Sequence, residues 1–321
     1  MGRRAFSRYA WFFVAYLVAV IVYGAWVRVT GSGAGCGSHW PTCNGEILPT
    51  EPAAKTIIEF THRITSGLCG VFGLVLVGWA FRLFGASSTV FRTAALTLVF
   101  IVFEALIGAG LVLGELVADN DSAARAIVIA LHLTNTLLLT ACAALTAWLA
   151  GDPQPPTARG QRPSPTLAAV GLLTLVLISV SGAVTALGDT LFPIEPTLGP
   201  GLLDKIRADL SSTNHFLVRL RVGHPLLAIL GALLVASLLA RPARQGAPWA
   251  RAALTFLAVE LGVGLWNVAW AAPGWLQLVH LLIAQALWVS ALLAFAPSWM
   301  AGAAPAPHAS RASSLTASRT A

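Results

Sequence analysis

Long apolar stretches dominate the chain, and short polar segments separate them. A helix needs roughly 20 apolar residues to cross the hydrocarbon core of a bilayer. Eight stretches meet this length, at 8–28, 56–81, 93–114, 125–150, 166–187, 211–240, 252–271 and 275–296. The first is too long for the apolar part of a signal peptide, so it is expected to be retained. The pattern predicts an all-α integral membrane protein with eight spanning helices.

The composition agrees with this fold class. Of the 321 residues, 57% are hydrophobic and only 10% are charged, whereas soluble domains carry about 25% charged residues. The net charge is +7, but the basic residues stand singly between apolar runs. A nucleic-acid partner is therefore excluded, and membrane lipid is the expected surrounding.

The basic residues concentrate on alternate polar segments. Arginines occupy the N-terminal segment and the segments 82–92, 151–165 and 241–251, while most acidic residues lie in the segments between them. Segments rich in Lys and Arg stay on the cytoplasmic side of a membrane. We therefore expect a multi-pass protein of the bacterial cytoplasmic (inner) membrane with both termini in the cytoplasm.

Two segments are not expected to fold. The Pro-rich segment 151–165 is typical of a cytoplasmic linker, and the small-residue segment 301–321 is typical of a disordered cytoplasmic tail. The linker divides the chain into an N-terminal half, 1–150, and a C-terminal half, 166–300.

The two halves carry a weak internal repeat. Their third helices contain FEALIGAGLVL around Glu104 and VELGVGLWNV around Glu260, and their fourth helices open with ALHLTNTLLL and LVHLLIAQAL. The second helices, EFTHRITSGLCG and LRVGHPLLAILG, also match. Since both halves run in the same direction, they predict two pseudo-symmetric four-helix bundles related by an axis along the membrane normal.

Four histidines occupy the outer halves of helices that run from outside to inside: His62, His132, His224 and His280. Ionisable residues inside a span are costly and indicate a function. Neutral imidazole binds haem iron, and two histidines on facing helices of a bundle can supply both axial ligands. We therefore predict one haem site in each half. Hydrogen bonds to neighbouring helices and a proton relay are the alternatives.

Glu59 precedes His62 by three residues, so both lie on one helix face. A carboxylate beside a haem ligand can move protons, which makes Glu59 the candidate catalytic residue. The equivalent position before His224 holds Arg221. The two sites are thus chemically unequal, and we infer that the first half reacts and the second holds a cofactor.

Two cysteines, Cys36 and Cys43, lie in the first outer loop, where the compartment permits disulfides. They favour a disulfide, which could be structural or redox-active. The alternative, a metal site that includes His39, fits the spacing of zinc ligands poorly.

Several arginines near the outer helix ends suit pairing with haem propionates, or simple anchoring at the interface: Arg28, Arg63, Arg125, Arg219 and Arg221.

The loop VRVTGSGAGC…WPTC, the motif EFTHR at 59–63 and the helix-opening His132 and His280 occur together. With these features the chain resembles the haem A synthase family over nearly its whole length. The resemblance implies oxidation of the C8 methyl of haem O to a formyl group, by successive hydroxylation and loss of water, giving haem A for aa3-type cytochrome c oxidase.

The resemblance also implies roles for single residues. The N-terminal half would hold the substrate haem O through His62 and His132, with Glu59 as the catalytic carboxylate. The C-terminal half would hold a haem b cofactor through His280 and one other histidine. Cys36 and Cys43 would match the outer-loop disulfide of one class of the family.

The sixth helix departs from the family pattern. Many relatives have a His-Arg pair there, but this chain reads NHFLVRLRVGHPLLA, with His215 and His224 as competing ligands. When the two halves are aligned so that His62 matches His224, Gly70 falls at approximately the same position as Gly231. This alignment favours His224 as the ligand.

Other functions use the same histidines. A bis-histidine electron carrier resembling cytochrome b would not need Glu59, and a haem transporter or chaperone would leave haem unchanged. A prenyltransferase needs an Asp-rich magnesium site, which the sequence lacks.

Haem O synthase and cytochrome c oxidase assembly factors are the expected partners. The sequence has no flavin or nicotinamide motif, so another molecule must donate electrons, and small-residue faces such as Gly108 and Gly110 leave an oligomer open.

Overall fold

The computed structural model describes residues 2–151, 162–193 and 202–300. Most of the expected linker and the whole expected tail, 301–321, lie outside these residues. The helices in chain order are α1 (Arg3–Val29), α2 (Ala54–Phe84), α3 (Thr89–Leu113), α4 (Ala123–Ala150), α5 (Pro165–Leu191), α6 (Leu202–Asp209), α7 (Phe216–Leu220), α8 (Gly223–Arg244), α9 (Pro248–Ala269), α10 (Gly274–Phe295) and α11 (Pro297–Met300).

Within the described ranges, eight helical segments are long and apolar enough to cross a membrane. Their outward faces carry large apolar side chains, such as Leu74, Leu233 and Leu265, which are 62%, 66% and 66% exposed. Water does not tolerate so many exposed apolar side chains, whereas lipid does. The predicted all-α multi-pass membrane fold is confirmed.

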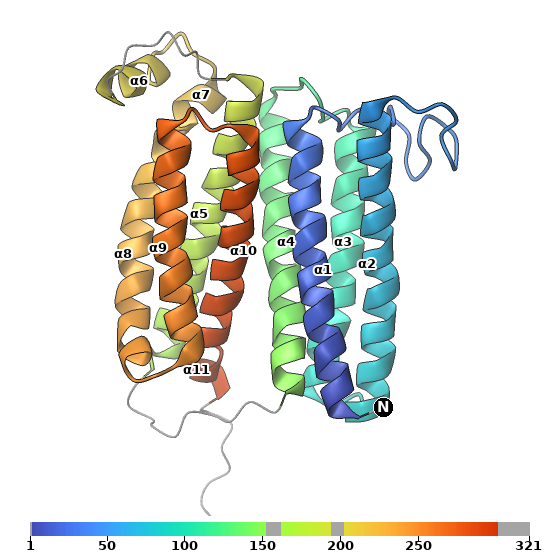
Figure 1. The fold of residues 1–321 in the computed structure, drawn as a ribbon, viewed down its shortest axis with the longest axis vertical. Coiled ribbons are helices and arrows are strands. Elements are labelled where there is room, and N and C mark those ends of the chain that lie inside the picture. The colour runs from blue at the N-terminus through green and yellow to red at the C-terminus, as the bar shows by residue number, and fades with distance from the viewer. Residues whose placement is uncertain (1, 152–161, 194–201, 301–321) are drawn as a thin grey trace, which may run out of the picture.

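The spanning helices form two groups that stand side by side (Figure 1). Helices α1 to α4 pack on one another, and α5, α8, α9 and α10 form the second group. The groups meet along a seam made by α1, α4, α5 and α10. Trp288 of α10 crosses this seam, because its indole Nε1 donates to the carbonyl of Leu137 in α4 at 2.9 Å. A symmetry between the two groups stays a prediction.

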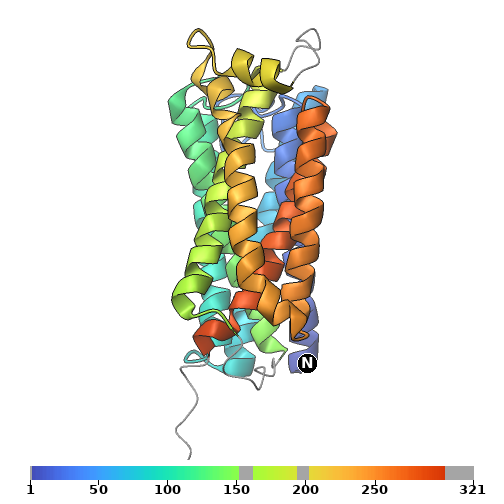
Figure 2. The same ribbon diagram turned by 90° about the vertical axis from the view of Figure 1, so that its left-hand side faces the viewer.

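Two of the seam helices, α4 and α10, are the best buried. In the most apolar windows of α4 and of the α10–α11 segment, 44% and 50% of residues are buried, against 11% in α9. Seen from the side, the two groups line up one behind the other in a narrow, elongated bundle (Figure 2). The N-terminus and α11 lie at one end, and the loop after α1, α6 and α7 lie at the other (Figure 1).

The predicted sixth helix, 211–240, is wrong in its first part. The span begins with the short α7 at Phe216, breaks after Leu220, and continues as α8 from Gly223. Pro225 explains the break, because a proline has no N–H and its ring clashes with the carbonyl four residues earlier, here that of Arg221. The outer helix α6 has no counterpart among the predicted elements.

Candidate functional site

The C-terminal histidine pair comes from α8 and α10. The Nδ1 atom of His224 lies 2.9 Å from the hydroxyl of Ser181 in α5, and the Nδ1 atom of His280 lies 3.2 Å from Oε1 of Glu260 in α9. The imidazole of His224 is therefore oriented through a hydrogen bond to Nδ1, whereas Nδ1 of His280 lies near Glu260 without a hydrogen bond. Histidines that bind metals usually have such a partner on the second ring nitrogen.

Glycines of neighbouring helices make room for these rings. A Cβ atom on Gly182 of α5 would lie 2.9 Å from Cε1 of His224, and one on Gly264 of α9 would lie 3.3 Å from Cε1 of His280. Since real Cβ atoms are almost never closer than 3.0 Å to a neighbour, the backbone of α5 can approach His224 only because residue 182 is glycine. The packing therefore fixes where the ring of His224 stands.

The N-terminal pair, His62 of α2 and His132 of α4, is held differently. Gly24 of α1 makes room for His62, since a Cβ atom there would lie 3.0 Å from its Cε1. The Nε2 atom of His132 lies 3.6 Å from Oε1 of Glu104 in α3. The Nδ1 atoms of both histidines, like that of His280, are buried and have no hydrogen-bond partner among the described residues.

Glu104 is itself tied to α4. Its carboxylate accepts hydrogen bonds from Nδ2 of Asn135 and from the hydroxyl of Thr136, each at 2.5 Å. The carboxylate thus bridges α3 and α4 beside His132. In both halves a glutamate of the third spanning helix lies next to a histidine of the fourth. The glutamate lies near Nε2 of His132 in the first half and near Nδ1 of His280 in the second.

The donor set suits haem better than a bare metal ion. The described part of the chain contains no group of three or more His, Cys, Asp or Glu side chains that could hold a metal ion. A haem brings its own four equatorial nitrogens, so one or two imidazoles suffice. Each half contributes two imidazoles, from α2 and α4 in the first and from α8 and α10 in the second. The donor chemistry of both pairs fits haem, and haem binding stays a prediction.

His215 lies apart from these pairs. It caps the start of α7, its ring stacks on Phe192 with centroids 4.8 Å apart, and its Nε2 lies 3.5 Å from Oδ2 of Asp121 in the loop before α4. It therefore connects outer loops of the two halves, whereas His224 lies in a spanning helix beside Ser181. The choice of His224 over His215 as a haem ligand stays a prediction.

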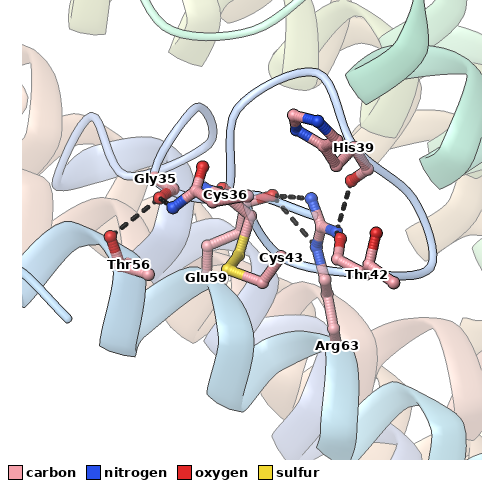
Figure 3. Close-up of polar contacts among 9 residues, drawn as sticks. Gly35, Cys36, His39, Thr42, Cys43, Thr56, Glu59 and Arg63 are labelled. Atoms are coloured by element: carbon pink, nitrogen blue, oxygen red, sulfur yellow. Dashed lines mark hydrogen bonds and ion pairs between the residues drawn. A yellow bond between two sulfur atoms is a disulfide. The ribbon is translucent and has the colours of Figure 1, made fainter. Parts of the chain in front are cut away.

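The first outer loop is fastened to α2 (Figure 3). Cys36 and Cys43 form the predicted disulfide, and both are fully buried. Glu59 accepts from the backbone N–H of Cys36 at 2.8 Å and from Nη2 of Arg63 at 2.5 Å. Arg63 in turn donates to the carbonyls of His39 and Thr42 at 2.6 and 2.7 Å.

These contacts give Glu59 a partner that the sequence did not indicate. Its side chain is buried, 4% exposed, and its carboxylate faces the disulfide loop as well as Arg63. Spacing alone placed it on one face with His62, but it could not show that the loop folds back over that face. Its catalytic role stays a prediction.

Three other candidate arginines, Arg28, Arg125 and Arg221, also donate to protein groups. Arg28 of α1 donates to the carbonyl of Ala186 at 2.7 Å, to the hydroxyl of Thr190, and to Oε1 of Gln277 at 3.0 Å. It thereby joins α1 to α5 and α10 at the outer end of the seam. Contacts with haem propionates stay a prediction for all of them.

Arg125 and Arg221 hold outer loops in a similar way. Arg125 donates to the carbonyls of Ala118 and Asn120 at 2.6 and 2.7 Å. Arg221 pairs with Asp189 at 2.8 Å and donates to the carbonyls of Gly188 and Phe192. Asp209 of α6 lies 3.9 Å from Arg221, and partial burial raises the pKa of Asp209 above its usual value while the guanidinium opposes that rise.

Three polar partners were not assigned a role from the sequence: Glu104, Glu260 and Ser181. The two glutamates were visible as charged residues inside the third helix of each half, at matching places in the repeat. That repetition was the available signal. Ser181 offered none, because a lone serine in an apolar helix commonly bonds its own backbone.

The fold and the paired histidines define a multi-pass membrane protein with two imidazole pairs inside its helix groups. A family model described as cytochrome oxidase assembly protein, COX15-CtaA, matches residues 7–292. The chain belongs to this family, which confirms the resemblance read from its loop and histidine motifs.

The curated relatives carry two different names. A protein of Thermus thermophilus named protoheme IX farnesyltransferase is 46% identical over 299 residues, which cover 90% of this chain and 48% of that protein. A heme A synthase of Halalkalibacterium halodurans is 41% identical over 143 residues, or 44% of this chain and 45% of the relative. Another, from Geobacillus kaustophilus, is 43% identical over 105 residues, 32% of this chain and 33% of that enzyme. The chain thus spans about half the length of the curated relatives it matches.

Proposed function

We propose that this chain is a haem A synthase, which oxidises the C8 methyl of haem O to a formyl group and so supplies haem A for aa3-type cytochrome c oxidase. The family and the relatives named heme A synthase support a place in haem A biosynthesis. The observation that carries the proposal is the pair of imidazoles in each helix group, with the two pairs held unequally.

The C-terminal pair is the proposed haem b site. The hydroxyl of Ser181 lies 2.9 Å from Nδ1 of His224, and Oε1 of Glu260 lies 3.2 Å from Nδ1 of His280, so neither group occupies Nε2. Such preorganisation suits a resident cofactor. Bound haem supplies the redox chemistry that side chains lack. On this basis residues 166–300 form the cofactor half.

The N-terminal pair is the proposed substrate site, and residues 1–150 form the substrate half. Neither His62 nor His132 has a hydrogen bond like the one that His224 makes with Ser181. A ring without that restraint suits a group that must enter and leave. Glu104 touches His132, and its Oε1 can hold a proton beside that ligand. Glu59 remains the other carboxylate proposed for catalysis.

Farnesyl transfer is not proposed for this chain, despite the name of the Thermus thermophilus relative. Transfer of a prenyl diphosphate needs clustered carboxylates for magnesium. The structure contains no such cluster in the residues it describes. The name supports a shared pathway instead, so we propose a haem O synthase as the partner that delivers substrate. Cytochrome c oxidase assembly factors would take the product.

The proposed location is the bacterial inner membrane, with both termini in the cytoplasm. The N-terminus and α11 lie at the same end of the helix groups (Figure 1), and the arginine-rich connections 82–92 and 241–251 join helices at that end. Lys and Arg favour the cytoplasmic side. The disulfide loop would then face the oxidising outer side.

Haem extraction tests the function. The chain is expressed with a haem O synthase in a host that lacks haem A, and the haems are identified by chromatography and mass spectrometry. Haem A or a hydroxylated haem O is the expected product. Glu104→Gln and Glu59→Gln are compared with Glu46→Gln, which alters a carboxylate in an exposed outer turn. Only unmodified haem b and haem O, bound with bis-histidine spectra, would refute the synthase and favour an electron carrier.

A further inference from the structure

A glycine in the first spanning helix of each half lies against the histidine of the second spanning helix. A Cβ atom on Gly24 of α1 would lie 3.0 Å from Cε1 of His62, and one on Gly182 of α5 would lie 2.9 Å from Cε1 of His224. The sequences around the two glycines, YGA and SGA, also agree. The two contacts therefore correspond between the halves, and the residues that precede the glycines can be compared.

The preceding residues, Tyr23 and Ser181, each contact the same histidine as the glycine beside them. The hydroxyl of Ser181 lies 2.9 Å from Nδ1 of His224. The ring of Tyr23 instead stacks on the imidazole of His62, with the ring centroids 5.9 Å apart and the planes at 29°. Aromatic rings attract one another at centroid distances of about 4.5–7 Å. One half thus holds its histidine by a hydrogen bond, and the other half holds it by a ring contact.

The other tyrosines of α1 show that Tyr23 does more than fasten α1 to α2. The chain has three tyrosines, Tyr9, Tyr16 and Tyr23, which are seven residues apart and therefore lie on nearly the same face of the helix. The hydroxyls of Tyr9 and Tyr16 donate to the carbonyls of Phe72 and Thr65 in α2, at 2.7 and 2.9 Å. Within the described ranges the hydroxyl of Tyr23 makes no such bond. Tyr23 therefore contacts α2 through its ring.

The ring of His62 depends on this contact for its orientation. Its Nδ1 atom is buried and has no hydrogen-bond partner among the described residues, so it lacks the restraint that Ser181 gives to His224. A stacked neighbour limits the tilt of an imidazole but occupies neither of its nitrogens. Tyr23 can therefore orient the ring and leave both nitrogens free.

We propose that Tyr23 is a positioning residue that orients the imidazole of His62 toward the substrate haem by stacking on it. The inference rests on the proposed function, since that function assigns His62 to the substrate. The aromatic ring has this role and the hydroxyl does not, so phenylalanine should replace tyrosine without loss.

The test is electron paramagnetic resonance of the ferric full chain, expressed with a haem O synthase, because the signal of a low-spin haem depends on how its axial imidazoles are oriented. His132→Ala and His280→Ala assign the signals to the two halves. Tyr23→Leu is expected to shift the N-terminal signal and to weaken binding of that haem about two- to tenfold. Tyr23→Phe should keep both signals. Ser181→Ala is the matched control in the other half and should shift the C-terminal signal alone.

Three results would overturn the proposal: an unshifted N-terminal signal in Tyr23→Leu, the same shift in Tyr23→Phe, or an equal shift of both signals in Tyr23→Leu, which would show a general loosening of the helices. Haem A formation is measured separately. Haem A from the wild type together with an unshifted signal in Tyr23→Leu refutes the positioning role and leaves the proposed function intact.

An N-terminal half that binds no haem would refute the proposed function, and a second measurement then decides on Tyr23. Proton NMR of the haem-free chain, labelled at histidine Cε1, detects the ring current of a stacked tyrosine. Tyr23→Leu should move the signal of His62, which His62→Ala assigns, and Tyr23→Phe should not. A moved signal supports Tyr23 as the residue that orients His62, whereas an unmoved signal overturns the contact.

Discussion

The fastening of the disulfide loop to α2 allows a quantitative prediction for Glu59→Gln. The carboxylate accepts from the N–H of Cys36 and from two nitrogens of Arg63, and Arg63 holds two loop carbonyls. Glutamine has one acceptor oxygen and no charge. The variant therefore leaves the Arg63 charge unbalanced and loosens the loop that carries both cysteines.

The loss of loop stability in Glu59→Gln follows from these contacts. Hydrogen bonds to charged groups contribute about 1.5–3 kcal/mol each, and removing one partner of a buried ion pair costs about 3–5 kcal/mol. The side chain of Arg63 is 13% exposed and keeps its two carbonyl acceptors. We therefore expect Glu59→Gln to destabilise the closed loop by about 2–3 kcal/mol. Since a tenfold change is about 1.4 kcal/mol, the open loop becomes about 30- to 150-fold more populated.

Reduction of the disulfide reports this opening, because both cysteines are fully buried in the closed loop. The rate is measured with a thiol reductant and maleimide trapping, in a background with Cys69→Ala and Cys142→Ala. Thr56→Val loses one neutral bond to the carbonyl of Gly35 and should speed reduction about fivefold. If Glu59→Gln were reduced at the wild-type rate, the loop would not depend on this carboxylate and the reasoning would fail.

Three further outcomes are expected. Gly182→Ala places a Cβ atom 2.9 Å from the ring of His224 and should lower the haem content of the purified protein, while Gly262→Ala, with open space around it, should not. His215→Ala should leave haem content unchanged in the pyridine haemochrome assay, since that ring lies in the outer loops; loss of haem would overturn this assignment. Trp288→Phe removes the buried hydrogen bond across the seam and should lower the free energy of unfolding by about 1–2 kcal/mol; unchanged stability would contradict it.

The fold was largely predictable from the sequence, because the length and hydropathy of each stretch determine where a helix can cross a bilayer. The structure contains all eight predicted spans. The sixth differs at its start, where Pro225 and the carbonyl four residues before it interrupt the ladder. Hydropathy averages over a window and does not register such a break.

The four histidines were conspicuous in the sequence, because they are ionisable residues at repeated places in apolar helices, and their pairing as haem ligands stays a prediction. Their partners were not conspicuous, because Glu104, Glu260 and Ser181 reach the rings from other helices. Helix rotation decides which side chains meet, and a single sequence does not specify it. The same limit applied to Glu59, whose partner is a loop that folds back over α2.

The hydrogen bond between Trp288 and Leu137 joins residues 151 positions apart in the chain. Synthesis proceeds from the N-terminus, and α4 enters the membrane long before α10 exists. The face of α4 that later packs on α5 and α10 must meanwhile contact lipid or a chaperone. One face of the first four helices therefore has no protein partner until α5 and α10 have been inserted. The fold is complete only when α10 packs against α4.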